Sequence, residues 1–170
     1  MAALGWASEP AAAGNSPQAV SMLRAYLSPA QAELFQRMSA SEQRHGLAVL
    51  QALERRGHAE AALGQAALLH DAGKIGGRLR LWHRVTTVLL DALTPGLLRR
   101  LACNQPASWR YPFFVLLTHA ERGAGMATQV GSDAVVSALI RWHHTPPDQT
   151  DLDAYSRVLL TAFRSADDNS

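Results

Sequence analysis

The chain has 170 residues, of which 48% are apolar and 18% charged, values typical of one globular domain and too apolar for a disordered chain. Its formal net charge is +2, and its fifteen arginines are scattered, so it lacks the concentrated basic run of many nucleic-acid-binding proteins. The single cysteine, Cys103, excludes an internal disulfide, and we expect a reducing, cytoplasmic setting.

Residues 1–17 are rich in alanine, proline and serine and predict a flexible N-terminal leader before a single domain over residues 18–170. They carry neither the basic region nor the apolar run of a signal peptide, and no later segment has the length of a membrane span. We therefore expect neither a membrane nor a nucleic-acid polymer as partner, and the sequence leaves the oligomeric state open.

Apolar residues recur every three or four positions along the chain, and the alternating pattern of strands is missing. The pattern predicts an all-α fold. Glycine and proline residues separate the expected helices, which cover residues 18–27, 29–38, 41–56, 59–73, 82–92, 95–103, 112–129, 132–144 and 151–168.

The helix over 41–56 directs one histidine towards the core. Ser39 and Glu42 have the spacing of a capping box, which assigns Glu42 to the start of the helix. His45 precedes Val49 by four residues and Leu53 by eight, so its imidazole lies on or beside the buried stripe.

The stretch "ALLHDAGKIGG" ends an apolar helix with polar residues. His70 and Asp71 close the apolar run, and Lys74, the only lysine in the chain, follows one turn later on the same face as His70. Three polar side chains at the end of a buried helix need partners or a function.

Three later helices also direct polar residues inward. His119 follows Val115 and Leu116 at helical spacing, and Asp167 continues a stripe that includes Leu159 and Phe163. His143 shares the face of Val136, Leu139 and Ile140, and His144 follows it at a helix end that two prolines close.

Each of these residues alone is more simply explained as a hydrogen-bonded core residue. Together, five histidines and two aspartates without partners would each cost about 1 to 3 kcal/mol, a cost that bound cations would remove. Histidine and carboxylate without thiolate suit iron, manganese, cobalt, nickel or zinc. If Asp71 gives one oxygen to each of two ions, the ligands divide into two sets, and Lys74 can reach an anionic substrate.

The remaining histidines and the tryptophans are weaker candidates for a functional site. His58 follows Gly57 at a helix junction, and His83 fits an exposed loop as well as a pocket wall. Trp82, Trp109 and Trp142 are interpreted as core or pocket-wall residues, because they do not form a series for base stacking.

The ordered pattern H…HD…H…HH…D, over about residues 40–168, resembles the HD-domain metal-dependent phosphohydrolase superfamily. "HDAGK", "THAERGAGMA" and "VVSALIRWHH" are similar to its HDIG/HD-GYP branch. The resemblance implies a helical bundle of HD type with a metal site in its core. It also implies a metal-dependent phosphohydrolase that cleaves a small phosphate ester of the nucleotide or cyclic dinucleotide class.

The resemblance further implies how the candidate ligands are divided between two metal ions. One divalent ion is expected at His45, His70, Asp71 and Asp167 and a second at His119, His143 and His144, with Asp71 bridging. Asp168 is the weaker choice for the last ligand. A water between the ions would attack phosphorus, and Lys74 would stabilise the phosphoryl oxygens. Iron or manganese is the first choice of metal, and zinc, cobalt, nickel or magnesium are further options.

The sequence also departs from the relatives' patterns. No GYP-like sequence accompanies "HDAGK", so cyclic di-GMP hydrolysis is not indicated. Ser41, four residues before His45, replaces the carboxylate that accompanies a third metal in some relatives, and no acidic pair of the stringent-response hydrolases follows "HD". Residues 76–112 resemble an insert that covers the site.

Two other functions remain open. The same ligand types serve mixed-valent di-iron oxygenases in this superfamily, and a non-catalytic domain could keep the site to bind a metal or a nucleotide for regulation. For the phosphohydrolase, Arg84 and Arg122 are added to Lys74 as candidates that bind the anionic substrate, although an ordinary surface or ion-pair role explains both arginines more simply.

Overall fold

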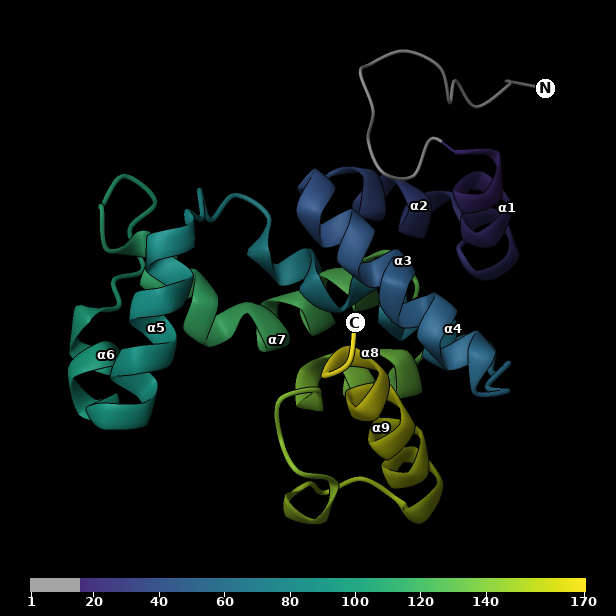
Figure 1. The fold of residues 1–170 in the computed structure, drawn as a ribbon. Helices are drawn as coiled ribbons and strands as arrows, with labels where there is room; N and C mark the ends of the chain where they lie inside the picture. The colour runs from purple at the N-terminus through teal and green to yellow at the C-terminus, as the bar shows by residue number, and fades with distance from the viewer. Residues whose placement is uncertain (1–15) are drawn as a thin grey trace.

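The computed structural model describes residues 16–170, and within this range the chain forms helices and no strands (Figure 1). The all-α prediction is confirmed. The expected leader lies outside the described residues except for Ser16 and Pro17, which already belong to the start of the first helix.

Serine side chains start the first three helices, α1 (Pro17–Tyr26), α2 (Pro29–Gln36) and α3 (Ala40–Arg55). Ser16, Ser28 and Ser39 each accept a hydrogen bond from a backbone N–H of the first turn, which would otherwise lack a partner. At α3 the Glu42 carboxylate also accepts from the Ser39 N–H, so the expected capping box is present.

Helix α4 (Ala61–Leu69) is the centre of the bundle. Its residues from Ala66 to Leu69 are fully buried, and it contacts α1, α2, α3, α8 and α9. The sequence predicted one helix over 59–73, but the α-helix ends at Leu69 and a 3₁₀ helix, η2 (His70–Lys74), follows.

The change from α-helix to 3₁₀ helix has a tertiary cause. Helix α7 (Tyr111–Gln129) packs tightly on η2, and a Cβ at Gly73 would lie 1.9 Å from the His119 carbonyl oxygen. Only glycine allows this approach, so the contact with α7 fixes the path of the chain through "HDAGK".

Residues 76–112, which we call the arm, contain α5 (Leu81–Leu93) and α6 (Pro95–Leu101). These two helices pack on each other and on α7, and Figure 1 shows them projecting from the remaining bundle. Their contacts lie at the start of α7, whereas the contacts of η2 lie along its middle.

The chain closes with α8 (Ala134–Trp142), η3 (Pro147–Gln149) and α9 (Ala154–Asp167). Helix α8 ends before His143 and His144, which the sequence had placed inside a helix, and Asp153 starts α9 by accepting from the Ser156 N–H. The other helix ends differ from the expected ones by three residues or fewer. None of the described helices combines the length and the apolar character needed to cross a bilayer.

Candidate metal centre

Five helical elements bring the seven predicted ligands together. His45 comes from α3, His70 and Asp71 from η2, and His119 from the middle of α7. His143 and His144 follow the last residue of α8, and Asp167 is the last residue of α9. The site therefore forms where the ends of α4, α8 and α9 meet the sides of α3 and α7.

One cluster contains His45, His70 and Asp167, whose candidate ligand atoms all lie within 4.8 Å of one another. Nε2 of His45 lies 2.8 Å from Oδ1 of Asp167, and Nε2 of His70 lies 3.6 Å from the same oxygen. Three residues that are 25 to 122 positions apart in the chain thus face one point.

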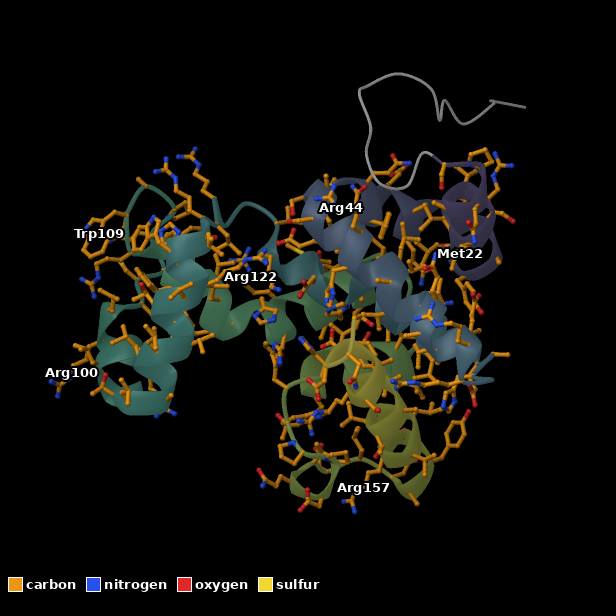
Figure 2. The ribbon with its side chains drawn as sticks, in the orientation of Figure 1. Met22, Arg44, Arg100, Trp109, Arg122 and Arg157 are labelled. Atoms are coloured by element: carbon orange, nitrogen blue, oxygen red, sulfur yellow. The ribbon has the colours of Figure 1, made fainter. Side chains whose placement is uncertain are left out.

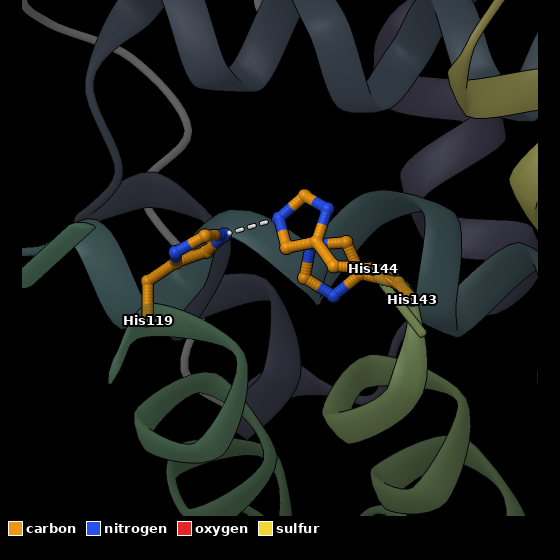
Figure 3. Close-up of side chains that lie close together, drawn as sticks. All are labelled: His119, His143 and His144. Atoms are coloured by element: carbon orange, nitrogen blue, oxygen red, sulfur yellow. Dashed lines mark hydrogen bonds between the residues drawn. The ribbon is translucent and has the colours of Figure 1, made fainter. Parts of the chain in front are cut away.

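The second cluster contains His119, His143 and His144, again with all candidate ligand atoms within 4.8 Å (Figure 3). Nε2 of His144 lies 2.9 Å from Nε2 of His119, and the His143 ring lies beside the His144 ring. This trio is rich in nitrogen donors and has no carboxylate of its own.

Asp71 lies between the two clusters. Its Oδ1 is 3.6 Å from Nε2 of His70 and 3.9 Å from Nε2 of His119, so one carboxylate faces a member of each cluster. Lys74 donates a hydrogen bond to the same carboxylate at 2.7 Å. The Asp71 carboxylate therefore faces both clusters.

Three of the rings are held by their own backbone. The Nδ1 atoms of His70, His119 and His143 lie 3.0, 2.7 and 2.6 Å from the carbonyl oxygens three residues earlier. Because a carbonyl only accepts, Nδ1 carries the hydrogen, and Nε2 keeps a lone pair that points into the site. A backbone hydrogen bond of this kind is the usual support of a metal-binding histidine.

The donor set fits bound cations. Nε2 of His143 is buried and has no hydrogen-bond partner among the described residues, although a buried ring nitrogen normally has one. A metal ion would supply this partner, and the nitrogen and oxygen donors suit the iron, manganese or zinc type of site.

The electrostatics keep the second cluster neutral. Burial, with the Lys74 charge next, lowers the pKa of His119 to about 4 and also lowers the pKa of His144. Burial and the neighbouring His70 lower the pKa of His143 well below its ordinary value. Neutral rings retain the lone pairs that metal binding requires.

The carboxylates are held ionised. Burial acts to raise the pKa of Asp71, but its electrostatic interactions with His70 and Lys74 outweigh burial and hold that pKa far below its ordinary value. Burial likewise opposes the change at Asp167, whose hydrogen bond with His45 is the next cause and lowers its pKa to about 2. The same hydrogen bond raises the pKa of His45.

A cavity of about 190 Å³ opens onto these groups. Every member of the two clusters except His119 lines it, together with Asp71, Ser41, Glu42, Lys74 and Arg84. The Arg84 guanidinium lies 3.3 Å from the buried Glu42 carboxylate. An adjoining cavity of about 370 Å³ shares Ser41, Glu42, Lys74 and Arg84 and adds Arg37 and Arg78. Basic side chains therefore line both cavities at the site.

Of the two arginines suggested as substrate ligands, only Arg84 lines a cavity at the site. Arg122 donates hydrogen bonds to Tyr111 Oη at 3.0 Å and to the Ile75 carbonyl at 3.2 Å, where the arm joins the bundle (Figure 2). Asp168 is exposed and lines neither cavity, whereas Asp167 faces His45.

Glu42 and Arg37 line the cavities at the site, although the sequence analysis did not predict them there. Glu42 was assigned to the helix cap, and it performs that role while its other oxygen faces Arg84. A signal was present, because Glu42 precedes His45 by three residues and so shares its helix face. No sequence signal places Arg37 there, since it follows a different helix.

Comparison with known proteins identifies one family. The family model for the HD domain matches residues 43–162, which include every candidate ligand except Asp167. Neither the curated proteins nor the solved structures gave a match to this chain.

Proposed function

The chain belongs to the HD domain family, and we propose that it is a metal-dependent phosphohydrolase that cleaves a small phosphate ester. HD domains are mostly metal-dependent hydrolases, and the two His/Asp clusters could hold divalent ions. The observation that carries the proposal is the Asp71 carboxylate, which faces His70 of one cluster and His119 of the other.

Two divalent ions, iron or manganese in the first instance, would act as Lewis acids on the phosphoryl group and generate a nucleophile from water at neutral pH. His45, His70, Asp71 and Asp167 would hold one ion, and His119, His143 and His144 the other. Two-metal sites, with ions about 3.5 to 4 Å apart, are common in enzymes that cleave phosphate esters.

The chain's own residues supply the rest of the site. Lys74 is 2.7 Å from Asp71, so its ammonium holds this carboxylate in place and faces the cavity where phosphoryl oxygens would lie. Arg84 reaches the same cavity from α5 and can pair with a second phosphoryl oxygen. The adjoining cavity with Arg37 and Arg78 offers space for the leaving group.

The basic side chains along the two cavities support an anionic substrate. A di-iron oxygenase with an anionic substrate, or a regulatory domain that binds a nucleotide, would use the same side chains, so metal content and activity must separate the three functions. In the experiment below, oxygen consumption identifies the oxygenase, and metal binding with neither hydrolysis nor oxygen consumption favours the regulatory domain.

The test is metal analysis of protein purified without chelator, combined with hydrolysis of p-nitrophenyl and bis(p-nitrophenyl) phosphate after addition of Mn²⁺ or Fe²⁺. We expect about two ions per chain and phosphatase or phosphodiesterase activity that Asp71→Ala abolishes. Iron with oxygen consumption and no hydrolysis would establish the oxygenase instead. Protein that binds no metal under any loading condition would refute both enzymes.

A further inference from the structure

The arm exposes an unusual amount of apolar surface. Eleven large apolar side chains are exposed in the described part of the chain, and eight of them lie on the arm. They are Leu81, Trp82, Val85, Val88, Leu89, Leu93, Leu97 and Trp109. Contiguous apolar surface of this kind usually marks a site of interaction.

Helix α5 exposes its apolar face to solvent, whereas an ordinary surface helix buries it. Leu81, Val85, Val88, Leu89 and Leu93 follow one another at three- and four-residue spacing, and Leu81 and Leu93 are 77% and 76% exposed. The inward face carries the buried His83 and the half-buried Thr87, whose hydroxyl is buried without a partner among the described residues. The apolar stripe of α5 therefore points to solvent, where it needs a cover.

The charge of the arm indicates what this cover is. The arm contains six arginines and one aspartate, a formal charge of +5, whereas the other 133 residues contain 10 basic and 13 acidic side chains. Arg99 and Arg100 form no ion pair with any described residue, so their charges are available to a partner. An identical arm of a second copy would bring like charges together, and an anionic partner would not.

The arm also has the features of an interfacial segment. The half-exposed Trp82 and the more exposed Trp109 accompany the apolar stripe, and indole rings favour the boundary between headgroups and acyl chains. Figure 2 shows Trp109 and Arg100 on the outer side of the arm, away from the bundle. Figure 1 shows α5 and α6 standing apart from the other helices, which do not cover the outer side of the arm.

We propose that the arm docks on an anionic lipid surface, with α5 lying in the plane of the interface. Its apolar stripe enters the headgroup boundary, and the surrounding arginines pair with lipid phosphates. The inference departs from the expectation of no membrane partner, which rested on the absence of a spanning segment. It does not depend on the proposed hydrolase activity.

The test is co-sedimentation of the full chain with vesicles of phosphatidylcholine alone and of phosphatidylcholine mixed with phosphatidylglycerol. We expect binding to the anionic vesicles only, weakened by salt, together with a blue shift of tryptophan fluorescence. The double variant Val88→Ser/Leu89→Ser should lower the affinity at least about tenfold, and Arg99→Gln/Arg100→Gln about fivefold for each arginine.

The matched control is Tyr155→Ser/Val158→Ser, which removes two similarly exposed apolar side chains from α9 and should leave vesicle binding unchanged. All the substituted residues are exposed, so thermal unfolding should confirm that the variants fold. Equal binding to neutral vesicles would overturn the proposal. It would also be overturned by a dimer in sedimentation analysis that Val88→Ser/Leu89→Ser dissociates while lipid binding is absent.

Discussion

Oδ1 of Asp71 lies 3.9 Å from Nε2 of His119, although the two residues belong to different elements and to different halves of the candidate metal centre. This distance is set by the close packing of η2 on α7. It brings one carboxylate close to a member of each candidate ligand cluster.

Asp71→Asn should reduce the bound metal from about two ions per chain to one or fewer. Asparagine keeps the shape of the side chain but loses the charge that faces both clusters, and it leaves the Lys74 ammonium without its partner. Phosphoesterase activity should fall by at least about a hundredfold. Elemental analysis and steady-state rates measure the two effects.

The control for this variant is Asp148→Asn, which changes an exposed aspartate in η3. It should retain both ions and full activity. If Asp71→Asn retained two tightly bound ions, the bridging role of Asp71 would be wrong.

Asp167→Asn and Asp168→Asn should differ sharply. Asp167 faces His45 and His70, whereas its neighbour is exposed and lies outside both cavities. Loss of the Asp167 carboxylate should weaken metal binding at the first cluster about 10- to 100-fold, measured by competition with a metal indicator. An equal effect from Asp168→Asn would mean that the last turn of α9 is placed differently.

The metal-free protein should lose stability as the pH falls from about 6.5 to about 4. Burial lowers the pKa of His119 to about 4, so in this range the unfolded chain binds a proton that the folded chain does not. The contribution is fully present above pH 6.5, and its loss is worth about 3 kcal/mol. The pKa values of His143 and His144 are also lowered, so these two residues change the stability in the same direction.

His45 opposes this trend, since its raised pKa adds stability below pH 6.5, but it is one group against three. Below this range, Asp167 should add a second loss as the pH falls from about 3.9 through its folded pKa of about 2. Urea unfolding after chelator treatment, repeated at several pH values, measures the effect. A constant free energy of unfolding between pH 7 and pH 4.5 would contradict the neutral state of these histidines.

Gly73→Ala should destabilise the protein by about 3 kcal/mol and disturb metal binding. A Cβ at this position would lie 1.9 Å from the His119 carbonyl oxygen and 2.7 Å from the Gly123 nitrogen, so η2 and α7 would have to separate. Gly125→Ala is the matched control on α7, because no atom lies within 4 Å of its Cβ position. It should stabilise the helix by up to about 1 kcal/mol, and urea midpoints compare the two.

The sequence was sufficient for the residues that helical periodicity places on a buried face. His45, His119 and His143 were each identified from apolar neighbours three or four positions away, and each points into the site. The periodicity works because α3, α7 and α8 bury one face against the same core.

Tertiary contacts decided the rest. The 3₁₀ turn at His70–Lys74 follows from the contact of Gly73 with α7, which lies 46 positions further along the chain and leaves no local signal. Arg122 follows His119 by three residues, but its guanidinium donates hydrogen bonds to Tyr111 Oη and to the Ile75 carbonyl and does not line the 190 Å³ cavity. For α5 the same periodicity predicts a buried stripe, and the structure exposes it.

Three histidine rings of the candidate metal centre are each held at Nδ1 by a carbonyl group of their own helical turn. Substitutions in the cavity wall therefore leave the donor atoms in place, provided that the helix ends persist. Arg37, Arg78 and Arg84 lie on other elements than the candidate ligands, so we expect substitutions at these arginines to change the choice of substrate without changing the metal content.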